Sequence, residues 1–112
     1  MIAITHFTVG AGEGDDGFVA RAQPALDALS RCAGYQRGSL GRSTDDPGAW
    51  VLLTEWTNVG SYRRALGNYQ VKLHATPLLA QARDLPGGFE TIVDVAPGGE
   101  TVVHASDREP LA

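Results

Sequence analysis

The chain has 112 residues, of which 43% are hydrophobic and 20% charged, and its formal net charge is −4. This length allows one domain with a single core, and the composition is ordinary for a soluble globular protein. The acidic balance argues against a nucleic-acid-binding surface, which needs clustered lysine and arginine.

No segment predicts a membrane span, a secretion signal or a disulfide. No apolar stretch approaches the roughly 18 residues of a membrane helix, and the N-terminus lacks a basic region followed by an apolar core. The single cysteine, Cys32, cannot form an internal disulfide, and its place near the end of an apolar helical stripe indicates a small buried residue. We therefore expect a cytoplasmic protein with no membrane partner.

The first part of the chain predicts a strand, a helix and a second strand. β-branched and aromatic residues over 2–9 indicate the first strand. Apolar residues at near-helical spacing predict a helix over 16–32, which Pro24 should kink or weaken and Gly34 should end. Two glycines in the weaker strand over 35–43 indicate a bulge or a close backbone approach.

The second part predicts a hairpin partner for that strand, a helical region and a last strand. An Asp-Asp-Pro-Gly turn leads into a strand over 49–57, so these two strands should pair as a hairpin. A helical region over 59–83 should be broken near Gly67–Asn68 and again near Pro77. After a Gly-rich loop, residues 89–95 complete the pattern as a strand.

The predicted order is β-α-β-β-α-β, the split βαβ arrangement of ferredoxin-like folds in the α+β class. We assign residues 1–96 to this domain. Its two helices cover one face of the sheet, and the other face remains apolar and must be buried elsewhere. Face-to-face association with a second copy is the simplest solution, so we predict a homodimer. The residues that form this free face are predicted to be Ile4, Val51, Leu53 and Ile92.

Residues 97–112 form a C-terminal tail in this prediction. The tail begins Pro-Gly-Gly, and the apolar run over 101–105 predicts one more strand, which we expect to cross to the partner subunit. A polar end follows.

The sequence contains none of the well-marked chemical motifs. It has no Gly-rich phosphate loop between a strand and a helix, no Ser-centred elbow, and no Cys/His cluster at zinc spacing, so we expect no metal site. What remains is an apolar pocket between sheet and helices, which is the usual composition of a small-molecule site.

Strand alternation indicates which residues line this pocket, beginning with Trp56 at the end of its strand. An indole offers a wide apolar plate and one N–H donor. If Trp56 faces the helices, Trp50, Leu52 and Thr54 share its face, while Thr5 and Phe7 share one side of the first strand. Tyr62, Tyr69 and His74 follow in the helical region. The alternative is structural: a core tryptophan, a core or rim tyrosine and a surface histidine.

Residues 2–95 resemble the antibiotic biosynthesis monooxygenase family of small dimeric α+β barrel proteins. The segments that carry the resemblance are His6–Val9, Thr54–Thr57, Tyr62–Leu66 and His74–Thr76. The resemblance to members that act in aromatic polyketide pathways implies oxidation of anthrone-like phenols to quinones with molecular oxygen and without a cofactor. In that group a strand tryptophan is followed six residues later by tyrosine or phenylalanine, as Trp56 is by Tyr62.

The resemblance implies roles for particular residues. Trp56 would stack on the substrate and donate its N–H, and Tyr62 and Thr5 would position substrate oxygens. His74 is the candidate base, because imidazole titrates near neutral pH. The remaining substrate-binding candidates are Phe7, Trp50, Leu52 and Tyr69.

Two departures from the family pattern leave alternatives open. Polyketide-type members have Asn at the positions of Thr5 and Leu52, and leucine can neither donate nor accept a hydrogen bond. A non-oxygenase protein of the same fold, either ligand-binding or cyclase-like, is therefore the second hypothesis. A haem-degrading branch has a histidine spaced like His74, but Ala65 stands where that branch has a second tryptophan.

Overall fold

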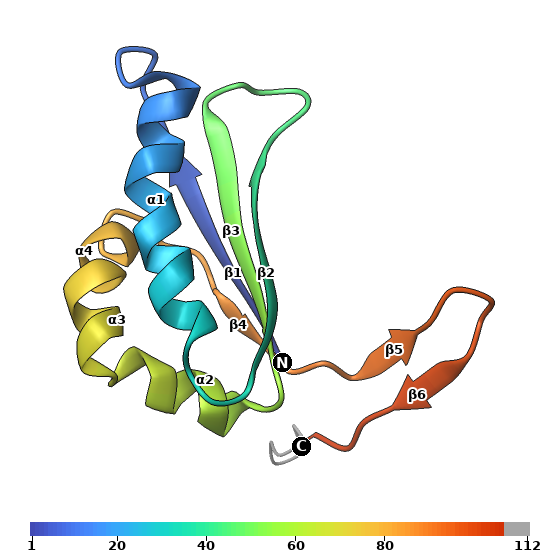
Figure 1. The fold of residues 1–112 in the computed structure, drawn as a ribbon. Coiled ribbons are helices and arrows are strands. Elements are labelled where there is room, and N and C mark those ends of the chain that lie inside the picture. Colours follow the sequence, from blue (N-terminus) through green and yellow to red (C-terminus); the bar gives the residue numbers. More distant parts are fainter. Residues whose placement is uncertain (107–112) are drawn as a thin grey trace.

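A four-stranded antiparallel sheet with helices on one face forms the body of the molecule (Figure 1). The computed structural model describes residues 1–106. The strands lie in the order β2-β3-β1-β4, and this arrangement confirms the predicted ferredoxin-like α+β fold. The elements of the body are β1 (Ile2–Thr8), α1 (Gly14–Ser30), β2 (Tyr35–Arg42), β3 (Ala49–Trp56), α2 (Val59–Leu66), α3 (Tyr69–His74), α4 (Thr76–Leu79) and β4 (Gly88–Phe89).

The two faces of the sheet follow the predicted alternation. Burial alternates strictly along β3, and its four buried side chains face the helices. On β1, Thr5 pairs with Leu52 and Phe7 with Trp50, so Thr5 and Phe7 share the helix-covered face. Ile4 pairs with Leu53 on the opposite face. The buried side chains of β3 are Trp50, Leu52, Thr54 and Trp56.

Helix α1 differs from its prediction at both ends, and Pro24 lies inside it as expected. It begins at Gly14, runs through Pro24 without a break and ends at Ser30. Pro24 is exposed, so the bond that it cannot make to the previous turn is lost on the solvent side. Gly34 does not end the helix, because Arg31 caps α1; with φ +90°, Gly34 lies in the turn just before β2.

The helical region breaks near both predicted points, after Leu66 and again at Ala75, and is shorter than predicted. Gly67 caps the end of α2, and Asn68 caps the start of α3. The Asn68 side chain accepts hydrogen bonds from the backbone N–H groups of Gln70 and Val71. Pro77 lies in the first turn of α4, where a missing N–H costs nothing. The chain is irregular from Ala80 to Gly87 and runs beside β1, so the predicted extension of the helix to residue 83 is wrong.

The predicted strand over 89–95 is also wrong. Only β4 joins the sheet, and it pairs with Ile2 and Ala3. The chain then leaves the sheet, and β5 (Val93–Val95) pairs with β6 (Thr101–Val103) in a separate hairpin (Figure 1). Ile92 therefore does not lie on the free face of the sheet. Gly98 and Gly99, at φ +92° and +95°, form the turn that makes this local pairing possible.

This hairpin, residues 93–103, is called the arm. It extends away from the body (Figure 1), and it includes the expected boundary between residues 96 and 97. The strand predicted over 101–105 is present as β6, but it pairs with β5 of the same chain. Its exchange with a partner stays a prediction, and the predicted polar end includes 107–112, outside the described residues. Within residues 1–106, no helix is both long enough and apolar enough to cross a bilayer.

Candidate functional site

A cavity of about 390 Å³ lies between β1, α2, α4 and the irregular segment after α4. Its volume is within the roughly 300–1,000 Å³ that is typical of small-molecule sites. The cavity is partly open to solvent. The side chains from the regular elements that line it are Ile4, Thr5, His6, Tyr62, Leu66 and Leu79.

Thr5 and Tyr62 supply hydroxyl groups to this apolar cavity. Neither hydroxyl makes a hydrogen bond with another of the residues 1–106. Burial raises the pKa of the Tyr62 phenol above its ordinary value near 10, because the charged phenolate is poorly solvated there. The phenol is therefore protonated at neutral pH and can donate a hydrogen bond. The structure brings together these two residues, both of which the sequence indicated.

Trp56 lies in the core beside the cavity and does not line it. Only 1% of the residue is exposed, and its Nε1–H donates to Thr54 Oγ1 at 2.8 Å. Its ring meets Tyr35 edge-on at 5.4 Å between centroids and Tyr62 at 5.6 Å. The expected stacking plate with a free N–H is thus absent from the subunit. Trp56 contacts the Tyr62 ring, and Tyr62 in turn lines the cavity.

Trp56 also borders a polar hollow of about 190 Å³ at the base of the arm. The other groups there include Glu55, Asp94 and His104, and His104 Nε2 lies 2.8 Å from Asp94 Oδ2. Because Trp56 is almost wholly buried, its ring offers little surface to this hollow.

The structure does not bring His74 or Tyr69 to the cavity. Both belong to α3, where only Val71 is buried. His74 is exposed in a groove between α1 and α3, together with Asp27 and Arg31. Tyr69 is 72% exposed. A helix of six residues has too few apolar positions to determine its buried face from the sequence. The sequence therefore does not determine whether Tyr69 and His74 face the cavity or the solvent.

Phe7, Trp50 and Leu52 are buried in the core of the sheet and do not line this cavity, although Phe7 and Trp50 border a separate hollow of about 290 Å³. The Phe18 ring packs against Phe7 at 5.4 Å and against Trp50 at 5.2 Å. Trp50 Nε1 is buried without a hydrogen-bond partner among the described residues. Leu52 is 2% exposed and pairs with Thr5 and Leu40. Leu52 is therefore a packed core side chain and offers no hydrogen-bonding group to the cavity.

His6 and Arg83 are cavity residues that the sequence did not indicate. Alternation places the side chain of His6 on the opposite face from Thr5, but β4 pairs with β1 only as far as Ala3. The edge of β1 is open beyond that point, so residues of both faces border the cavity there. The Arg83 N–H donates to the His6 carbonyl at 2.8 Å, which draws both residues to this edge. The predicted break near Pro77 was the sequence signal that the helical region ends early and that the following segment can lie beside β1 as a cavity wall.

A scan against family models matches residues 1–75 to the model described as "Antibiotic biosynthesis monooxygenase". The chain belongs to this family. The matched region contains Thr5, Trp56 and Tyr62, and it ends one residue after His74. A search of curated proteins gives no significant match.

Solved structures with a similar fold cover most of the chain. A variant of SnoaB from Streptomyces nogalater, described as a cofactor-independent oxygenase, is 22% identical over 96% of this chain and 93% of its own, with a TM-score of 0.62. A conserved protein from Methanosarcina mazei is 16% identical over 78% and 84%, also at 0.62. An antibiotic biosynthesis monooxygenase is 13% identical over 96% and 100%, at 0.59. At these identities the similarity shows the fold.

No group of three or more His, Cys, Asp or Glu side chains placed to hold a metal ion occurs in residues 1–106. The polar residues that line the cavity carry hydroxyl, imidazole, guanidinium and carboxylate groups, and the carboxylate belongs to Asp84. These groups can hold a phenol or an enolate by hydrogen bonds and by charge.

Proposed function

We propose that this protein is a cofactor-independent monooxygenase that oxidises a polycyclic, anthrone-like phenol to a quinone with molecular oxygen. The observation that carries the proposal is the pair of unpartnered hydroxyls, Thr5 and Tyr62, in an apolar cavity of a monooxygenase-family fold. The fold similarity to SnoaB, a cofactor-independent oxygenase, supports the same reaction class.

The chemistry requires proton removal and charge stabilisation. Loss of a proton from the methylene carbon of an anthrone leaves an electron-rich enolate, which can itself reduce oxygen. A carbon–oxygen bond then forms, the O–O bond breaks, one oxygen atom remains as the new carbonyl, and the other leaves as water. The Tyr62 phenol and the Thr5 hydroxyl would hold the enolate oxygen, where fixed donors stabilise developing charge.

We assign the proton transfer to His6, because this residue lines the cavity and an imidazole can both accept and donate a proton. The guanidinium of Arg83 at the same edge favours the anionic form of the substrate. His74, the base expected from the sequence, lies in the outer groove beside Asp27. Trp56 acts on the reaction by packing against the Tyr62 ring.

Oxygen uptake with dithranol, an anthrone, tests the proposal. We expect oxygen consumption and quinone formation in equal amounts with the wild-type protein. His6→Gln should lose most turnover at neutral pH and recover part of it at higher pH, where the substrate ionises by itself. His74→Gln is the matched control and should keep wild-type turnover. Absence of oxygen consumption over a panel of anthrones would refute the oxygenase assignment.

A second candidate is a ligand-binding or cyclase-like protein of the same fold. Leu52 packs in the core and the Trp56 N–H is bound to Thr54, so neither an amide nor an indole donor reaches the cavity. In that case dithranol would quench protein fluorescence on binding without oxygen consumption. The same experiment therefore separates the two functions.

We further propose that the protein is a homodimer and that the arm contacts the partner. An isolated two-stranded hairpin is at best marginally stable in water. Large exposed apolar patches of this kind mark interaction sites. The arm valines Val93, Val95, Val102 and Val103 are between 49% and 71% exposed.

Light scattering on the purified protein tests the dimer. Twice the mass of the chain is expected for the wild type, and Val103→Asp should shift the population towards the monomer. Val19→Asp places the same charge on an exposed valine of α1 and should leave the dimer intact. A monomeric wild type at micromolar concentration would exclude the assembly.

A further inference from the structure

The cavity wall formed by residues 80–87, here called the strap, contains no fully buried residue. It has no regular secondary structure, and its largest apolar side chain, Leu85, is 46% exposed. The other walls belong to β1, which pairs with β3 over seven residues, and to α2, which Asn58 caps. Segments with few buried apolar contacts open most easily.

Two backbone hydrogen bonds attach the strap to the open edge of β1. The Arg83 N–H donates to the His6 carbonyl at 2.8 Å, and the Ile4 N–H donates to the Gly87 carbonyl at 2.7 Å. Between these two bonds lie Asp84 and Leu85, which line the cavity. Separation of the strap from β1 would therefore open the cavity from the side.

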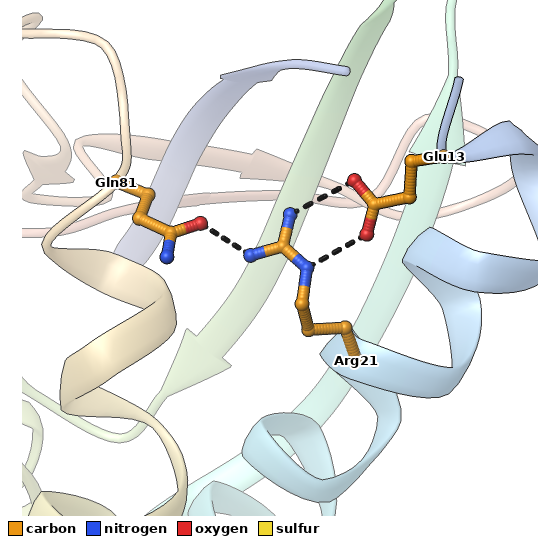
Figure 2. Close-up of polar contacts among 3 residues, drawn as sticks. All are labelled: Glu13, Arg21 and Gln81. Atoms are coloured by element: carbon orange, nitrogen blue, oxygen red, sulfur yellow. Dashed lines mark hydrogen bonds and ion pairs between the residues drawn. The ribbon is translucent and has the colours of Figure 1, made fainter. Parts of the chain in front are cut away.

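A third attachment lies at the start of the strap and depends on Arg21 of α1. Figure 2 shows the guanidinium between Glu13 and Gln81. Arg21 Nε and Nη2 donate to the Glu13 carboxylate at 2.8 and 3.2 Å, and Nη1 donates to Gln81 Oε1. The guanidinium carbon also lies 5.2 Å from the centroid of the Phe18 ring. The Arg21 group is thus held by Glu13 and Phe18, and its remaining donor is directed at the strap.

We propose that Arg21 is a positioning residue that holds the strap closed through Gln81, and that release of this contact admits ligand to the cavity. The contact is exposed, and exposed charged contacts are individually weak. A weak contact suits this role, because it biases the position of the strap without locking it. Loops that close over a bound substrate in this way commonly limit turnover. The ligand that enters is the phenol of the proposed function, so this last step rests on that function.

Hydrogen exchange of single amides tests the contact without any ligand. In Gln81→Leu, we expect the Arg83 and Ile4 amides to exchange about 1.5 to five times faster, the range of a lost exposed contact. The amide of Val9, which bonds to Gly48 at 2.8 Å in the body, should be unchanged. Gln81→Glu keeps an acceptor for Arg21 and should restore slow exchange. Arg31→Gln removes the α1 ion pair with Asp27, far from the strap in sequence, and is the matched control.

Equal exchange in wild type and Gln81→Leu would overturn the proposal, and so would a rise at Val9 as large as that at Arg83. Turnover of dithranol gives a second readout, in which Gln81→Leu should change KM about threefold or more, while Arg31→Gln should not. If dithranol is not oxidised but the exchange pattern is as expected, the proposed function fails and the strap contact stands. If dithranol is oxidised but the exchange pattern is absent, the proposed function stands and the strap contact is refuted.

Discussion

Around Trp56 the helix-covered face of the sheet is filled, whereas beside Thr5 on the neighbouring strand it is hollow. Near Trp56 the indole N–H has an acceptor, and two tyrosine rings pack against the indole. Near Thr5 the Thr5 and Tyr62 hydroxyls have no partner among residues 1–106, and an irregular segment replaces a strand. The comparison shows that the most conspicuous aromatic residue of the sequence lies in the packed core, while Thr5 and Tyr62, the less conspicuous residues, line the cavity.

Removal of the indole should have the largest effect on stability. Trp56→Ala leaves a cavity in a filled region and should lower the free energy of unfolding by about 3–5 kcal/mol. Urea unfolding followed by circular dichroism measures this value. A loss below about 1 kcal/mol would mean that the region around Trp56 is not tightly packed.

The Thr54 hydroxyl should matter to stability far more than the Thr5 hydroxyl. Thr54→Val leaves the buried Trp56 N–H without an acceptor, which should cost about 1–3 kcal/mol. Thr5→Val removes a hydroxyl that bonds to no other described residue, and its free energy of unfolding should stay within about 0.5 kcal/mol of wild type. Equal losses in the two variants would remove the distinction between the filled and hollow regions.

The two tyrosines that flank Trp56 should differ in turnover. Tyr62→Phe removes a donor from the cavity, and we expect dithranol oxidation to fall about tenfold or more, equivalent to about 1.4 kcal/mol of transition-state stabilisation. Tyr35→Phe removes the corresponding hydroxyl on the other side of the indole, away from the cavity, and should leave turnover unchanged. Steady-state oxygen uptake with dithranol measures turnover in both variants. Identical rates in Tyr62→Phe and Tyr35→Phe would contradict a role for the Tyr62 phenol.

The smallest expected effect is the alkaline response of stability. Burial raises the pKa of Tyr62 in the folded protein, so above pH 10 the unfolded chain loses this proton first. The wild type should therefore lose stability relative to Tyr62→Phe as the pH rises from about 10 through the folded pKa. Urea unfolding of both proteins at pH 9 and pH 10.5 measures the change, and a constant difference would show that Tyr62 is as solvated in the folded state as in the unfolded state.

The body of the fold was predictable because its signals are local. Alternation along β1 and β3 assigned Thr5 and Trp56 to the helix side, and the Gly67–Asn68 break was visible as helix punctuation. The arm was not predictable, because alternation over 89–95 is satisfied equally by pairing with β1 or with β6. The lining of the cavity was predictable in part: Tyr62 and Thr5 follow from alternation and helix position, whereas His6 and Arg83 depend on how far β4 accompanies β1. The functional roles of these residues stay predictions.

The short length of β4 has a consequence for adaptation. Because β4 ends so early, the strap meets β1 through main-chain atoms of Arg83 and Gly87, and these bonds do not depend on which side chains lie between. Asp84, Leu85 and Pro86 can therefore be exchanged for residues of other size or charge while the ladder between β1 and β3 stays intact. In such a scaffold, acceptance of a new molecule requires a few point substitutions in one exposed stretch, and the parts that make the polypeptide fold are spared.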